Sequence, residues 1–432
     1  MSSESLDMQQ KDSIEIKPTN GLNSEITAPP SKAYTLRALF ISSLCDGRSV
    51  LKNALYADDQ KSAADCLGKL GASIEFKSGD FVVQGNSGHP KAAGENLFVG
   101  DSGVTARFIC AYASLAEGRT FIDGSERIRE RPVGELISSL NKLGVKSSYL
   151  SNENFLPVQI NGKSLRGGKT AIDAQKSSQY VSAILIAAPY AEKDVEISIK
   201  GKIKSEPYVD ITLQCMKDFG VSAKKSKGRY FVKAGQEYKA RDYAIEGDYS
   251  SASYFFAAAA ITKGRIKVKN LKKDSAQPDS VLPKLLEKMG CKVNYDEKFI
   301  EVYGKELKGI EVNMKDSPDV VPTLAVVAAF AKGKTIIKGV EHLRLKESDR
   351  IKSVVSNLQK MGVDAKEAKD GMAIRGNPDK IRAIEVETFD DHRIAMAFAM
   401  AGLAVGGMKI KNPDCVNKSF PDFFRVLSSI GD

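Results

Sequence analysis

The stretch PDVVPTLAVVAAFAKGKTIIKGVEHLRLKESDRIKSVVSNLQKMGV, residues 318–363, contains one complete structural repeat. A polar start, Pro318-Asp319, precedes an apolar, Ala-rich helix, which Gly333 ends before a short β-branched strand. After a polar turn, apolar residues recur at helical spacing from Ile351 to Met361 and predict a second, amphipathic helix. Gly362 follows that helix, as is typical of a helix C-terminus.

The apolar-glycine pair at the end of this stretch recurs along the whole chain, at intervals of 69 to 76 residues. The six pairs are Leu70-Gly71, Leu143-Gly144, Phe219-Gly220, Met289-Gly290, Met361-Gly362 and Ile430-Gly431. Polar starts also recur before the other Ala-rich helices, at Ser31-Lys32, Ser102-Gly103, Ser177-Ser178-Gln179, Ser250-Ser251 and Asp391-His392-Arg393. Such regular self-similarity predicts six α/β repeats, which divide naturally into two groups of three.

The repeats predict two domains with two chain crossings between them. If an N-terminal strand, Ser13 to Lys17, packs on the C-terminal half, the crossings fall near Thr27 to Pro30 and near Tyr243 to Gly247. A cleft between the two domains is then the expected ligand site. The predicted boundaries are a disordered tail at 1–12, a first three-repeat domain at 30–245, and a second three-repeat domain at 13–29 plus 246–432.

Composition narrows the classes of function. The net charge is +10, but the basic runs, such as Lys224 to Arg229, are short and lack interleaved aromatic residues. This pattern argues against nucleic acid and an anionic membrane, and favours a small anionic substrate. Six cysteines without a CxxC pair and three histidines without metal-ligand spacing predict a reducing compartment and no metal. No signal peptide or membrane-length apolar run is visible, so we predict a cytoplasmic protein.

The polar starts predict an anion site. A helix N-terminus carries unpaired N–H groups and a partial positive charge, so several such ends aimed at one cleft would attract phosphates and carboxylates. Asp319 and Glu347 are the candidate acid or base groups among the cations of that cleft. The cations beside helix starts or in polar turns are Lys32, Arg37, Arg107, Arg127, Lys346, Arg350, Arg393 and Lys418.

At these positions the chain resembles the 5-enolpyruvylshikimate-3-phosphate (EPSP) synthase family. The motifs that carry the resemblance are PPSKAYTLRAL, GDSGVTARF, GSERIRERP, SSQYVSA, SEPYVDIT, EGDYSSASYF, SPDVV, LRLKESDR, DDHRIAMA and NKSFPDFF. The resemblance implies an α/β fold of two domains, each with three βαβαββ repeats around pseudo-threefold symmetry, and an active site in the interdomain cleft. It also implies transfer of the enolpyruvyl group of phosphoenolpyruvate to the 5-hydroxyl of shikimate 3-phosphate, with release of phosphate and without metal or cofactor.

The resemblance also implies roles for single residues, and it implies a monomer without nucleic-acid or membrane partners. Catalytic roles fall on Lys32, Asp319 and Glu347. Contacts with shikimate 3-phosphate fall on Lys32, Arg37, Ser177, Ser178, Gln179, Ser205, Tyr208, Asp319 and Lys346. Contacts with phosphoenolpyruvate fall on Lys32, Gly103, Arg127, Gln179, Arg350, Arg393 and Lys418.

Several positions depart from the family pattern. Ala33 replaces a serine and removes one hydroxyl, while Asp101 and Val104 replace an asparagine and a threonine. A carboxylate at position 101 would repel phosphoenolpyruvate unless it is paired or turned away. His342 and Leu36 also stand where other polar residues are common.

Other functions remain open as alternatives. The sister family transfers enolpyruvyl to UDP-N-acetylglucosamine, but it typically carries a reactive cysteine in the loop that here reads DGSERIRERP, residues 123–132. A non-catalytic paralogue and an RNA-binding paralogue are the remaining alternatives.

Overall fold

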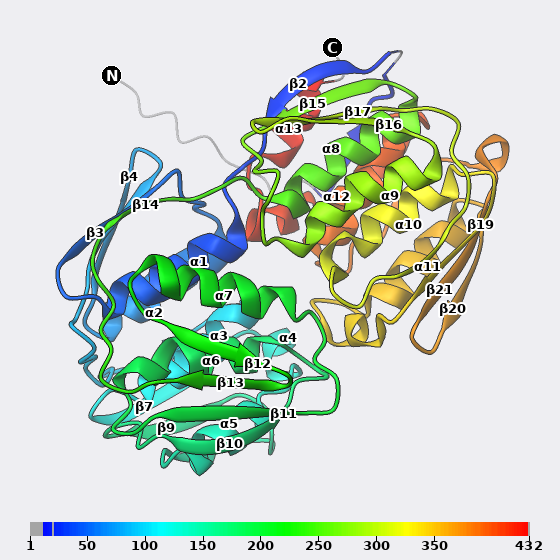
Figure 1. Cartoon of the computed structure of the whole chain (residues 1–432). Helices are drawn as coiled ribbons and strands as arrows, with labels where there is room; N and C mark the ends of the chain where they lie inside the picture. The colour runs from blue at the N-terminus through cyan, green and yellow to red at the C-terminus, as the bar shows by residue number, and fades with distance from the viewer. Residues whose placement is uncertain (1–11, 20, 431–432) are drawn as a thin grey trace, which may run out of the picture.

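The computed structural model describes residues 12–19 and 21–430, and these form a mixed α/β fold of many small sheets (Figure 1). Residues 318–363 contain the predicted helix, strand and helix. They run through the 3-10 helix η3 (Pro318–Val320), α10 (Val321–Ala329), β19 (Gly333–Lys338), η4 (Glu341–Leu345) and α11 (Arg350–Lys360). The predicted tail falls outside the described residues except for Asp12, and so does Gly431.

The glycine of each described apolar-glycine pair adopts a positive φ, between 85° and 123°. Glycine reaches this region without steric cost, which is why it recurs where each amphipathic helix ends. The helices that end at these pairs are α2 (Asp58–Lys69), α5 (Gly134–Lys142), α7 (Pro207–Asp218), α9 (Val281–Met289) and α11. The repeat predicted from the sequence is therefore confirmed at five of its six positions.

Five of the sheets have four strands in the same order, a parallel pair followed by an antiparallel hairpin. In the first sheet the strand order is β14 (Asp242–Ala244), β3 (Arg48–Lys52), β5 (Asp80–Gln84) and β4 (Ser73–Lys77). In the second sheet the order is β6 (Leu97–Phe98), β7 (Gly118–Asp123), β9 (Val158–Gly162) and β8 (Lys146–Tyr149). The next is β10 (Gly168–Asp173), β11 (Val195–Lys200), β13 (Arg229–Val232), β12 (Ala223–Ser226). In the fourth sheet the strand order is β2 (Asn23–Thr27), β15 (Arg265–Lys269), β17 (Phe299–Tyr303) and β16 (Lys292–Tyr295). In the fifth sheet the order is β18 (Glu311–Asn313), β19, β21 (Gly371–Gly376) and β20 (Asp364–Ala368).

The sixth sheet is completed by the N-terminus. Strands β22 (Glu385–Val386) and β23 (Met408–Lys411) form its parallel pair, and β1 (Ser13–Ile16) pairs antiparallel with β23. The prediction that an N-terminal strand packs with the C-terminal half is confirmed. After β23 the described chain continues into η6 (Pro413–Lys418) and α13 (Phe423–Ile430) and forms no further strand. Strand β1 therefore lies where each of the other sheets has its antiparallel hairpin.

The Ala-rich helices form the centre of each half. Nearly every residue of α8 (Tyr249–Thr262) and α12 (His392–Gly402) is buried, as expected of helices that are apolar all round. In the second half, α8, α10 and α12 pack against one another. The first half has α1 (Lys32–Leu44), α3 (Gly103–Ala113) and α6 (Gln179–Ala187), the last continued by η1 (Ala188–Tyr190). The remaining short helices are α4 (Glu126–Arg129), η2 (Pro278–Ser280) and η5 (Pro378–Lys380).

The buried apolar residues form two separate cores. One core runs from Tyr34 to Ile245, and the other combines Ile16 to Ala28 with Tyr249 to Ile430. This division supports the predicted domain boundaries, which we keep as a proposal. No helix among the described residues is long and apolar enough to cross a membrane.

The two chain crossings lie side by side between the cores. The strand before the first crossing, β2, pairs with β15 of the second half, and the strand before the second crossing, β14, pairs with β3 of the first half. Pro30 and Gly247 form an antiparallel bridge between them. Ser31 N donates to Glu246 O (2.8 Å), and Asp248 N donates to Pro29 O (2.8 Å). The crossings therefore form a short two-stranded connection from which α1 and α8 start.

Candidate active site

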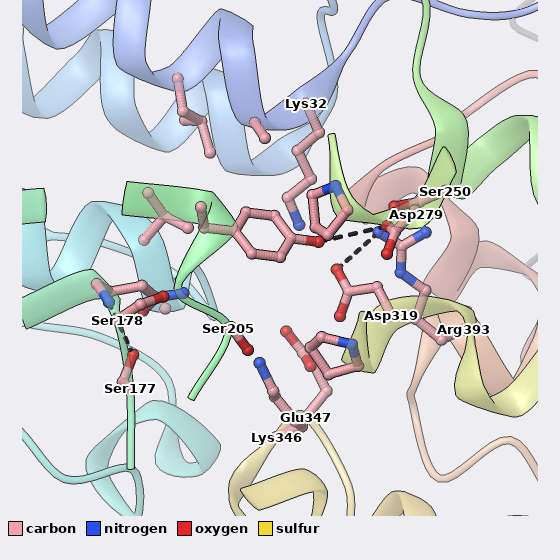
Figure 2. Close-up of a pocket in the computed structure, with 18 of the residues that line it drawn as sticks. Lys32, Ser177, Ser178, Ser205, Ser250, Asp279, Asp319, Lys346, Glu347 and Arg393 are labelled. Carbon is pink, nitrogen blue, oxygen red and sulfur yellow. Dashed lines mark hydrogen bonds and ion pairs between the residues drawn. The ribbon is translucent and has the colours of Figure 1, made fainter. Parts of the chain in front are cut away.

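A cleft lies between the two halves, and it contains about 950 Å³ of empty space including the part open to solvent. Helix starts from both halves line it, as the polar starts predicted. Figure 2 shows Ser177, Ser178 and Ser205 on one side of the cleft, and Asp279, Asp319 and Arg393 on the other. The predicted site residues that line the cleft are Lys32, Arg37, Gly103, Ser177, Ser178, Gln179, Ser205, Tyr208, Asp319, Lys346, Glu347, Arg350 and Arg393.

Arg350 is the centre of the charged cluster in the second half. Its side chain is 2% exposed and contacts three carboxylates. Its Nε lies 2.8 Å from Asp391 Oδ2, its Nη1 lies 2.9 Å from Asp319 Oδ1, and its Nη2 lies 2.8 Å from Glu347 Oε2. A buried guanidinium with such forked contacts fixes carboxylates in place. Arg393 adds a further contact, because its Nη2 lies 3.1 Å from Asp319 Oδ2.

These cations decide the protonation of the two candidate carboxylates. Burial alone would raise the pKa of Asp319, but Arg393 and Arg350 outweigh it and hold the pKa well below its usual range. Burial likewise acts to raise the pKa of Glu347, while Arg131 and Arg350 lower it to a net value well below the usual range. Both groups are therefore carboxylates at neutral pH in the ligand-free cleft.

Lys32 and Lys418 are joined through one carboxylate. Asp59, at the start of α2, lies 2.6 Å from Lys32 Nζ through Oδ2 and 3.0 Å from Lys418 Nζ through Oδ1. Lys418 does not line the cleft; its Nζ also contacts Asp101 Oδ2 at 3.3 Å and donates to Asp101 O at 2.7 Å. The carboxylate of Asp101 is thus paired with Lys418, so its negative charge is offset.

The serines of the first half face the other end of the cleft. Ser177 Oγ accepts from Gln179 N at 3.2 Å, and Ser205 Oγ lies 3.5 Å from His342 Nε2. Ser205 has a φ of 56°, an uncommon conformation for a serine. Arg37 is 2% exposed, and its guanidinium donates to Thr212 Oγ1 and to the carbonyl oxygens of two residues of the same half rather than to a carboxylate. Its positive charge is therefore not neutralised by an ion pair with a described residue.

Arg127, like the predicted cation Arg107, does not line the cleft. Its Nε donates to Glu347 O (2.7 Å) and its Nη2 to Lys346 O (2.6 Å), so it holds the backbone of the loop that carries those side chains. Arg131, which the sequence analysis did not single out, lines the cleft instead, with Nη1 3.4 Å from Glu347 Oε1. Of the three arginines in the motif SERIRERP, Arg131 lines the cleft, and the role predicted for Arg127 stays a prediction.

Other lining residues had no distinct sequence signal. Asp279 is 2% exposed, and its Oδ2 accepts from Tyr208 Oη (3.3 Å) and from Ser250 Oγ. Burial, with a contribution from Asp319, raises the pKa of Asp279 to about 7. Asp248 caps α8 through Ser251 N (2.7 Å) and also accepts from Lys32 N (3.1 Å) at the start of α1. Single aspartates at helix starts are too common in sequences to identify either position.

The fold and the cleft define a class, the two-domain α/β proteins built from repeated sheets around a cationic interdomain site. Residues 16–427 match the family described as EPSP synthase (3-phosphoshikimate 1-carboxyvinyltransferase). The chain belongs to the EPSP synthase family.

Individual relatives agree with this membership. The chain is 43% identical to the 3-phosphoshikimate 1-carboxyvinyltransferase of Trichormus variabilis, over 95% of this chain and 97% of the relative. It is 42% identical to the protein of the same name from Methanoculleus marisnigri, over 97% and 99%. Among solved structures, an EPSP synthase from Acinetobacter baumannii superimposes with a TM-score of 0.82 at 26% identity, covering 97% of this chain and 98% of that one.

Proposed function

We propose that this protein transfers the enolpyruvyl group of phosphoenolpyruvate to the 5-hydroxyl of shikimate 3-phosphate and releases phosphate, as a step of aromatic amino-acid biosynthesis. The observation that carries the proposal is the pair Arg350 and Arg393 holding Asp319 in a cleft whose other wall presents three serines. Joining two polyanions requires that their mutual repulsion be offset while they are held in contact, and buried cations do this.

The two walls suggest where each substrate binds. The hydroxyls of Ser177, Ser178 and Ser205 face the shikimate 3-phosphate position, and Arg37 is available for its carboxylate. Lys32, Arg350 and Arg393 are available for phosphoenolpyruvate. We add Arg131 to this second set in the position assigned to Arg127, because Arg131 lines the cleft and Arg127 does not. Lys418 adds its positive charge to this set indirectly, through its ion pair with Asp59, which also pairs with Lys32.

The proton transfers follow from the charges. In the first step the 5-hydroxyl adds to C2 of phosphoenolpyruvate as C3 gains a proton and becomes a methyl carbon. In the second step this methyl group loses a proton as phosphate leaves, and a Glu347 that has given up its own proton can accept it. Asp319 is ionised and can accept the hydroxyl proton. Glu347 must gain a proton before it can act as a donor to C3. The two bound anions favour this protonation, because they compete with Glu347 for Arg131 and Arg350 and so raise its pKa.

Finer statements remain proposals. We propose a cytoplasmic monomer that uses no metal or cofactor and binds no nucleic acid. These statements rest on the family resemblance and on the absence of long basic runs in the sequence.

The decisive assay measures phosphate release from phosphoenolpyruvate by the purified protein, without added metal. One reaction contains shikimate 3-phosphate as acceptor and a parallel reaction contains UDP-N-acetylglucosamine. We expect release with the first acceptor only. Release with the second acceptor would assign the protein to the sister activity, and no release with either from a folded protein would support a non-catalytic paralogue.

A further inference from the structure

Beside the main cleft lies a smaller cavity, here named the side cavity, with about 300 Å³ of empty space including the part open to solvent. Some of its lining belongs to the main cleft as well, so the two are neighbours. The residues that line both are Arg131, Lys176, Ser177, Gln179, His342 and Lys346. The residues that line only the side cavity are Arg107, Pro132, Tyr180 and Leu345.

The lining of the side cavity is cationic and includes no described aspartate or glutamate. Four of its ten residues are Arg107, Arg131, Lys176 and Lys346. Of these, only Arg131 forms an ion pair with a described residue, through the contact of 3.4 Å with Glu347. In contrast, the main cleft is lined by several carboxylates, including Asp319 and Glu347, which form ion pairs with Arg350.

Arg107 is the most unusual of these cations. Its side chain is 3% exposed, and its Nη1 and Nη2 donate to the backbone carbonyls of Gly103 (3.0 Å) and Pro132 (2.8 Å). No described carboxylate pairs with it. Burial, together with the nearby charge of Arg131, lowers the pKa of Arg107 to about 10. A buried guanidinium without a counter-charge is unfavourable, and the association of an anion would relieve it.

Three buried nitrogen atoms of the lining also lack a hydrogen-bond partner among the described residues. They are Arg107 Nε, Arg131 Nε and His342 Nδ1, from side chains that are 3%, 5% and 4% exposed. Buried polar atoms are nearly always hydrogen-bonded in folded proteins, and the two arginine Nε atoms are donors at any pH, so these two unpaired donors indicate a missing acceptor. Guanidinium groups pair best with phosphate and carboxylate oxygens.

We propose that the side cavity is a second oxyanion subsite that takes inorganic phosphate. The six lining residues that it shares with the main cleft place it next to the main cleft. On the proposed function, on which this part of the inference rests, the ion is the phosphate released from phosphoenolpyruvate, and the side cavity receives it before it leaves the protein. Arg107 is then a product-binding residue rather than a structural one.

The test is equilibrium dialysis of the whole chain against radiolabelled inorganic phosphate, with shikimate 3-phosphate present at saturation. At saturation, shikimate 3-phosphate occupies its own binding site, so labelled phosphate cannot bind there. The wild type is expected to bind one phosphate in the main cleft and a second in the side cavity. Arg107→Met should lose the second ion, Arg107→Lys should keep it with weaker affinity, and Arg393→Met should lose the first ion only.

Two further variants keep the test decisive. Lys176 is exposed, so Lys176→Met can test the side cavity even if Arg107→Met does not fold; we expect it to weaken the second site about three- to tenfold, from loss of one charge. Arg119→Met, an exposed arginine of β7 outside both cavities, is the control and should bind as the wild type does.

The inference is overturned if Arg107→Met and Lys176→Met bind as much phosphate as the wild type. It is also overturned if shikimate 3-phosphate abolishes the Arg107-dependent site, because the side cavity would then be only the end of the substrate's own phosphate position. Dialysis needs no turnover. A protein that binds the second phosphate but releases none from phosphoenolpyruvate would therefore contradict the proposed function and not the subsite.

Discussion

Three arginines alternate in the loop from Arg127 to Arg131, and each has a different environment. Ser125 caps the short helix α4 through Ile128 N (3.2 Å), which turns Arg127 toward the backbone of the second half. Arg129 pairs with Asp123 at the surface, and Arg131 reaches Glu347 in the cleft. Identical side chains thus make different contacts because the short helix α4 and the residues after it turn them toward different surroundings.

We expect Arg131→Ala to lower kcat/KM for phosphoenolpyruvate. Hydrogen bonds to charged groups contribute about 1.5–3 kcal/mol, or roughly 10- to 150-fold. Steady-state kinetics at saturating shikimate 3-phosphate measures the effect. Arg129→Ala is the matched control, because its partner Asp123 lies outside the cleft, and it should leave both kinetic constants unchanged. Equal effects of the two substitutions would contradict the assignment of Arg131.

The raised pKa of Asp279 predicts that the stability of the fold depends on pH. Its folded pKa of about 7 lies above the value of about 3.9 for an unfolded aspartate, so the folded state holds a proton that the unfolded state releases. The free energy of unfolding should therefore fall as pH rises from 4 to 7. Each pKa unit corresponds to about 1.4 kcal/mol.

Asp279→Asn removes this titration and keeps an oxygen that can accept from Tyr208. The variant should gain stability relative to the wild type as pH rises, by up to a few kcal/mol between pH 4 and pH 8. Urea unfolding of both proteins across that range provides the measurement. A difference that does not change with pH would show that the carboxyl group titrates normally.

At the scale of the elements, the two crossings depend on a close backbone approach at Gly247. A Cβ at this position would lie 2.2 Å from Asn270 O and 3.0 Å from Ala28 Cβ. The crossing also carries Asp248, whose carboxylate caps the starts of both α1 and α8. The glycine therefore sets the separation of the segments from which the first helix of each half begins.

Gly247→Ala is expected to destabilise the protein by about 1–3 kcal/mol, as overpacking in a buried site does. Gly68→Ala is the matched control, because Gly68 lies exposed in α2 and a Cβ there meets no atom within 4 Å. Replacing a helical glycine by alanine should stabilise by roughly 0.5–1 kcal/mol. Chemical denaturation of both variants tests the pair, and a neutral Gly247→Ala would contradict the close approach.

At the scale of the whole molecule, polar contacts join the two halves across the cleft. Arg127 of the first half donates to the carbonyls of Lys346 and Glu347 in the second, and Lys418 of the second half pairs with Asp59 of the first. The apolar cores do not share residues. The relative position of the halves therefore depends on polar groups at the site, and ligands that contact both halves should influence it.

We expect Arg127→Ala to weaken the contact between the two halves, because it removes the hydrogen bonds to the carbonyls of Lys346 and Glu347. Its kinetic signature should be a several-fold rise in KM for both substrates with little change in kcat, because Arg127 contacts the backbone of the loop and does not line the cleft. Small-angle X-ray scattering of the ligand-free variant should give a larger radius of gyration than the wild type. A large loss of kcat at unchanged KM would instead favour a direct role in the reaction.

The repeat pattern, the helix and strand order, the strand at Ser13–Ile16 and thirteen of the residues that line the cleft could be predicted from the sequence. Glycine at positive φ, helix periodicity and polar helix starts are local requirements, so they leave a local pattern. The position of Arg131 in the cleft lining, the pairing of Asp101 with Lys418 and the burial of Asp279 could not be predicted. These depend on contacts between residues far apart in the chain, such as Asp59 and Lys418, and no local pattern records which side chains meet when the two halves come together.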